Sequence, residues 1–133
     1  MTLDFELTML IAAIVLGFVH LIAASHATSL RRGYRWTAGA RDEILPPLTG
    51  IAGRLARASA NFAETFPYFA ALVLAVEITG HRDAYSWWGA ALYIGARVAY
   101  LPLYAFGVFL VRSLVWNVGT AGIVLLIVAL VRA

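Results

Sequence analysis

The sequence predicts an all-α integral membrane protein, folded as an up-down bundle of four helices. Of its 133 residues, 62% are hydrophobic and only 13% are charged, whereas soluble domains are about half apolar and about a quarter charged. Four apolar stretches are each long enough to supply the roughly 20 residues of a membrane-spanning helix. Short links place successive helices antiparallel, so we expect a single domain over residues 1–133.

The first spanning helix is predicted at residues 5–29, an apolar run that contains His20 and His26. The longest polar segment, residues 31–50, separates it from the second helix. The remaining helices are expected at residues 51–79, 84–110 and 114–131.

Arginines are distributed unevenly between the two sides of this bundle. Only Arg82 and Arg132 belong to the side of the termini. Because cytoplasmic loops carry an excess of basic residues, we expect the first and third loops to face the cytoplasm and both termini to lie on the opposite side. The side of these loops holds Arg31, Arg32, Arg35, Arg41, Arg54, Arg57 and Arg112.

Composition also excludes several kinds of site. The net charge is +3, but the basic residues are few and scattered among apolar runs, so a nucleic-acid partner is not expected. With no cysteine, the chain has neither a disulfide framework nor a thiolate metal site. His20 and His26 lie six residues apart, on different helix faces and without an acidic neighbour, so we expect no metal site.

Two neighbouring helices carry polar side chains at helical spacing. Arg57, Asn61 and Glu64 fall within roughly 60° of one face of the second helix. Ionisable groups inside a membrane are costly unless they are paired or wetted, so each one is a functional candidate. The third helix has a matching stripe, formed by Tyr93, Arg97, Tyr100 and Tyr104.

These stripes allow two interpretations. In the first, Arg57 and Glu64 pair and simply lock helices together, with Asn61 bridging them. In the second, the arginines exceed the single carboxylate, because Arg97 adds a further positive charge. An excess of arginine beside tyrosyl hydroxyls is what a buried anionic ligand needs.

The second-helix segment resembles the signature of the MAPEG family, the membrane-associated proteins of eicosanoid and glutathione metabolism. The matching residues are Arg57, Asn61, Glu64 and Pro67. Residues 96–104, 112–113 and 31–32 also resemble the family, so the likeness spans nearly the whole chain. The chain is similar to a short, bacterial-type, microsomal glutathione transferase-like member.

This resemblance implies a homotrimer of four-helix subunits in the lipid bilayer, with glutathione as co-substrate between adjacent subunits near the cytoplasmic face. It implies a transferase or peroxidase that acts on lipophilic small molecules, in which Arg112 stabilises the thiolate and Tyr100 lies beside it. The residues that would bind glutathione are Arg31, Arg57, Asn61, Glu64, Arg97 and Tyr104.

Two alternatives stay open at this point. The chain has Ala60 and Thr65 where animal members of the family often carry other residues, which is compatible with a noncatalytic structural or binding protein of the same fold. A small multidrug-type transporter is the other alternative. Such a transporter needs an isolated membrane carboxylate, whereas Glu64 shares its helix face with Arg57.

Overall fold

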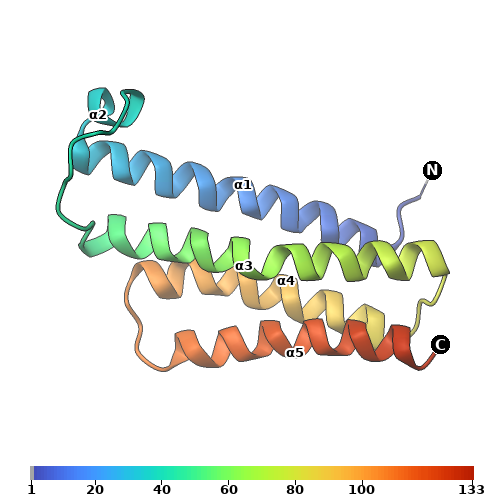
Figure 1. Cartoon of the computed structure of the whole chain (residues 1–133). Helices are drawn as coiled ribbons and strands as arrows, with labels where there is room; N and C mark the ends of the chain where they lie inside the picture. The colour runs from blue at the N-terminus through green and yellow to red at the C-terminus, as the bar shows by residue number, and fades with distance from the viewer. Residues whose placement is uncertain (1) are drawn as a thin grey trace.

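The computed structural model describes residues 2–133, and every regular element in that range is helical. Four long helices, α1, α3, α4 and α5, lie side by side, and the short helix α2 follows the end of α1 (Figure 1). The elements are α1 (Phe5–Arg32), α2 (Tyr34–Ala38), α3 (Gly50–Thr79), α4 (Ala84–Ala105) and α5 (Val111–Val131).

Three of the described helices, α1, α3 and α5, are long and apolar enough to cross a membrane. These helices identify the chain as an integral membrane protein. Helix α4 is also 22 residues long, but it carries Arg97 and four tyrosines, which lower its apolar character.

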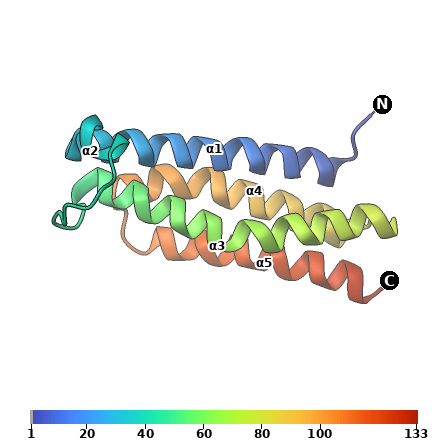
Figure 2. The same cartoon turned by 45° about the horizontal axis from the view of Figure 1, so that its top comes forward.

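The two ends of the molecule are built from different segments. The chain termini and the turn at residues 80–83 lie at one end, which we call the terminal end (Figures 1 and 2). Helix α2, the rest of the segment at residues 33–49 and the link at residues 106–110 lie at the other, which we call the loop end. Successive long helices therefore run in opposite directions.

Two helices end at residues other than those predicted, and α5 begins at Val111 rather than at residue 114. Helix α1 continues to Arg32 and stops at Gly33, whose φ of 89° is unfavourable for residues with a side chain. Helix α4 ends at Ala105 rather than at Leu110, because Gly107 turns into a left-handed conformation with φ 69°. The segment from Gly33 to the start of α3 and the segment from Gly107 to the start of α5 both lie at the loop end.

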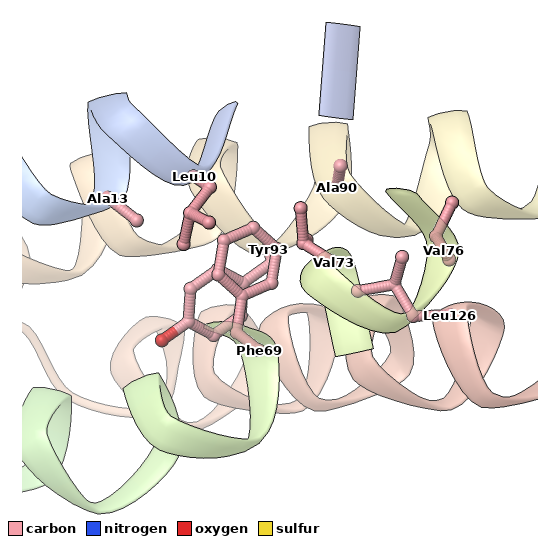
Figure 3. Packing of buried hydrophobic residues seen from close by; sticks show 8 residues of the cluster. All are labelled: Leu10, Ala13, Phe69, Val73, Val76, Ala90, Tyr93 and Leu126. Carbon is pink, nitrogen blue, oxygen red and sulfur yellow. The ribbon is translucent and has the colours of Figure 1, made fainter. Parts of the chain in front are cut away.

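The apolar core contains side chains from all four long helices (Figure 3). The rings of Phe69 and Tyr93 stack with their centroids 4.0 Å apart. In a bilayer the lipid is as apolar as the core, so van der Waals packing of this kind holds helices together. The cluster comprises Leu10, Ala13, Phe69, Val73, Val76, Ala90, Tyr93 and Leu126.

Helices α4 and α5 approach so closely that their backbones touch. A Cβ atom on Gly122 would lie only 2.6 Å from the carbonyl oxygen of Gly89. A Cβ on Gly89 would meet the carbonyl oxygen of Gly122 at 2.8 Å. Small residues at such crossings let membrane helices pack tightly, and here they fix the polar face of α4 against α5.

Candidate functional site

Arg97 of α4 lies at the centre of the polar side chains between the helices and is only 1% exposed. Its Nη1 donates to Asn61 Oδ1 at 2.7 Å, and its Nη2 donates to Thr65 Oγ1 at 2.8 Å. The guanidinium also faces the rings of Tyr93 and Tyr100, at 5.5 and 5.4 Å from their centroids. A buried cation is therefore held by two neutral acceptors and two aromatic rings.

No carboxylate neutralises this charge. Within residues 2–133, ion pairs are found only between Arg82 and the carboxylates of Asp4 and Glu77, at the terminal end. Arg57 and Glu64 do not pair with each other in the chain. The interpretation of these two residues as a packing lock within one chain is therefore wrong.

Tyr104 forms a second polar centre, closer to the loop end. Its hydroxyl accepts a hydrogen bond from Arg57 Nε at 3.0 Å. Its ring lies close to two cations, with Arg112 at 5.0 Å and Arg57 at 5.9 Å from the centroid. Arg54 adds a third cation to this end of α3 and donates to the carbonyl oxygen of Ala105 at 2.8 Å.

Two adjacent cavities open beside these residues. The first has a volume of about 310 Å³ and the second about 240 Å³, and both are lined by Arg112 and Ser113 at the start of α5. The other residues lining the first are Asn61, Tyr100, Trp116 and Asn117. Those lining the second are Arg54, Arg57, Tyr104 and residues 107–110. One cavity is thus rich in amides and hydroxyls, and the other is rich in arginine.

Most of the predicted site residues come together here. Five of them, Arg57, Asn61, Tyr100, Tyr104 and Arg112, line one or both cavities, and Arg97 lies behind Asn61.

Two predicted residues lie elsewhere in the chain. Glu64 is exposed on α3 and lines neither cavity. Arg31 lines a separate cavity of about 440 Å³, which it shares with Arg32 and residues 45–49.

Several residues of this region were not predicted as site residues, among them Thr65, Trp116 and Asn117. Thr65 was noted only as a departure from the family pattern, although it follows Asn61 by one helical turn on the polar face. Trp116 and Asn117 also line the amide-rich cavity. A lone amide in an apolar helix is a signal for function, and that signal was available for Asn117.

His20 is buried on α1 but is part of the packing between α1 and α3. Its Nδ1 bonds to the carbonyl oxygen of Leu16 at 2.9 Å, and its ring stacks on Phe62 with centroids 4.8 Å apart. Residues 2–133 contain no group of three or more histidine, cysteine or acidic side chains that could hold a metal ion.

Comparison with known protein families shows a match to the MAPEG family over residues 9–132. The matched range includes Arg97, Thr65 and every residue that lines the two cavities. Comparisons with curated proteins and with solved structures gave no match.

Proposed function

Since the chain belongs to the MAPEG family, we propose that it is a membrane-bound, glutathione-dependent transferase or peroxidase that acts on lipophilic electrophiles. The observation that carries this proposal is the pair of cations, Arg57 and Arg112, close to the ring of Tyr104, next to a cavity lined by amides and hydroxyls. Neither cation has a carboxylate partner among the described residues 2–133, so the site favours an anionic ligand.

The chemistry of glutathione fits this set of side chains. The tripeptide has two carboxylates, one ammonium group and a thiol. Arg57 would bind a carboxylate through charge-assisted hydrogen bonds, and Arg31 would supply a further cation. Asn61 and Tyr104 would bind the peptide groups, and Glu64 would bind the ammonium.

Arg112 is the residue we propose for thiolate stabilisation, because it lines both cavities. A thiol has a pKa near 8.5, and a fixed cation beside it lowers that value, so more thiolate is present at neutral pH. The thiolate then attacks the electrophile, and a carbon–sulfur bond forms as the leaving group departs. The hydroxyl of Tyr100, in the same cavity, is the second candidate to stabilise the sulfur.

Exposure of two site residues supports assembly of several subunits. Arg57 and Glu64 are both exposed on α3 in the single chain, and charges facing lipid are costly. We propose a homotrimer of four-helix transmembrane subunits, in which a neighbour covers this face and completes the site. Native mass spectrometry in mild detergent should detect the trimer, and a protein that stays monomeric would contradict a shared site.

The arginine bias supports an orientation with the loop end in the cytoplasm. A reporter fused after Ala133 should then be active outside the cytoplasm, and one inserted between Arg35 and Arg41 should be active inside. The reverse pattern would overturn this orientation.

Lipophilic substrates would reach the site from the bilayer. An apolar cavity of about 290 Å³ opens between α1 and α3 and includes Gly17, Phe18, Phe62 and Phe66. Such a cavity can hold a lipophilic electrophile beside the lipid.

Calorimetry of the detergent-purified protein with glutathione tests the proposal. We expect saturable binding to glutathione and much weaker binding to glutathione with both carboxylates esterified. Absence of binding to glutathione would contradict the proposal. Binding without turnover of a chlorodinitrobenzene electrophile or a lipid hydroperoxide would favour the noncatalytic alternative.

A further inference from the structure

We propose that Arg97 is a positioning residue, which fixes the side-chain amide of Asn61 so that its NH2 group faces the ligand cavity. Arg97 would act on the ligand only through Asn61. The identity of the ligand rests on the proposed function, but the contact between Arg97 and Asn61 does not.

The orientation of Asn61 follows from the donor chemistry of arginine. A guanidinium carries five N–H donors and no acceptor, so the amide atom that faces Arg97 has to be the oxygen. The two ends of an asparagine amide are otherwise interchangeable and are assigned from their hydrogen-bond partners. With Oδ1 bound to Arg97 Nη1 at 2.7 Å, the Nδ2 group is left for the cavity that Asn61 lines.

Arg97 itself is too deeply enclosed to bind the ligand. It is 1% exposed and lines neither cavity. Its Nη1 and Nη2 bond to Asn61 and Thr65. Its Nε is buried without a partner and faces α5, where a Cβ on Gly119 would lie 3.8 Å away.

Thr65 holds the other half of the guanidinium fork. Its Oγ1 accepts from Arg97 and also bonds to the hydroxyl of Tyr93 at 3.0 Å. Asn61 and Thr65 are one helical turn apart on the same face, so the planar fork reaches both acceptors at once. A lysine at this position has a single compact ammonium and would not reproduce that geometry.

The buried charge also strengthens the donors that Asn61 presents. Hydrogen bonds in series polarise one another, most strongly where the surroundings are of low dielectric. A cation bound to Oδ1 draws electron density from the amide, so its N–H groups become better donors. Asn61 would therefore select a ligand with an acceptor at this point, such as a carboxylate or a peptide carbonyl.

Asn61→Asp separates this role from a merely structural one. The carboxylate supplies a counter-ion to Arg97, so the thermal unfolding midpoint in detergent should stay equal to that of the parent or rise. The same change removes the amide donors, so glutathione should bind about tenfold more weakly or worse. Asn61→Ala is the matched control, and its midpoint should fall.

Thr65 gives a second test, at a residue that lines neither cavity. Thr65→Val keeps the shape of the side chain but removes the hydroxyl that accepts from Arg97. Arg97 would then hold Asn61 less firmly, and glutathione should bind roughly fivefold more weakly. Thr65→Ser keeps the hydroxyl and should bind as the parent does.

Three results would overturn the inference. Asn61→Asp could bind glutathione as tightly as the parent, or it could destabilise the protein as much as Asn61→Ala does. Thr65→Val could bind as tightly as Thr65→Ser. If the parent protein binds no glutathione, the proposed function fails, and the midpoints of the two Asn61 variants still decide whether the contact with Arg97 exists.

Discussion

Within residues 2–133, the terminal end is the one at which an arginine pairs with carboxylates. At the terminal end, Arg82 contacts Asp4 at 2.7 Å and Glu77 at 2.6 Å. The hydrogen bond from Arg82 to Glu77 raises the pKa of this guanidinium. The charge of Arg82 is thus balanced by carboxylates, and these ion pairs tie the start of α1 to the end of α3. Arg132, at the same end, donates to the Tyr85 hydroxyl at 2.6 Å.

At the loop end, the arginines bond to neutral oxygens. Arg32 donates to the carbonyl of Pro46 at 3.1 Å, and Arg54 donates to that of Ala105. Nearer the middle of α3, Arg57 donates to the hydroxyl of Tyr104. Neutral acceptors orient a guanidinium without cancelling its charge. The terminal end is therefore suited to holding helices together, and the loop end to binding an anion.

The largest expected effect comes from Arg57→Ala. Loss of a charged donor should weaken glutathione binding by roughly a hundredfold, measured by calorimetry. Stability without ligand should fall by only about 1 kcal/mol, because Arg57 is exposed and its one partner is a neutral hydroxyl.

Arg82→Ala is the matched control at the terminal end, and it should leave glutathione binding unchanged. A loss of about 3–5 kcal/mol of stability in Arg57→Ala, as expected when a buried ion pair is broken, would instead mean that Arg57 has a structural role.

Gly122→Ala tests the close contact between α4 and α5. The new methyl group would meet the Gly89 carbonyl at 2.6 Å, so we expect a loss of about 1–3 kcal/mol in thermal or denaturant unfolding. Gly95→Ala is the matched control, since nothing lies within 4 Å of its Cβ position. It should gain about 0.5–1 kcal/mol from helix propensity. Equal effects of the two substitutions would contradict this view of the α4–α5 contact.

The smallest effect is expected from Glu6→Gln at the terminal end. Glu6 is 4% exposed and accepts a hydrogen bond from the hydroxyl of Ser86. The backbone N–H of Ser86 donates to the side chain of Asp83, which caps α4. Glutamine keeps an acceptor but loses the charge, so the free energy of unfolding should fall by about 1 kcal/mol. Glutathione affinity should not change. A loss of affinity here would show that the two ends are not independent.

Much of the fold could be predicted from the sequence, because helix length and apolar character depend on composition. The family prediction is confirmed by the match over residues 9–132. The prediction that the third helix ends at Leu110 was wrong. The sequence stays apolar beyond Ala105, so composition alone does not locate the turn at Gly107. Helix α2 lies in the polar segment, where no periodic pattern marks five helical residues.

Five of the predicted site residues line the two cavities, but the hydrogen-bond partners of these residues could not be predicted. Spacing alone brought Arg57, Asn61 and Glu64 to one face of α3. It did not predict that Asn61 bonds to Arg97 while Arg57 bonds to Tyr104. Those choices depend on how α4 packs across α3, which is decided by contacts far apart in the sequence.

We propose that the positive charge at the loop end ionises the thiol of bound glutathione, and ultraviolet absorbance detects the thiolate. Titration of the protein with glutathione near neutral pH should produce a saturable thiolate band. The band should disappear in Arg112→Ala, with only modestly weaker binding, and persist in Tyr100→Phe. If Tyr100→Phe removes the band and Arg112→Ala keeps it, the assignment of Arg112 is wrong. If bound glutathione shows no thiolate band at all, the proposed ionisation of the thiol is contradicted, and the protein binds glutathione without activating it.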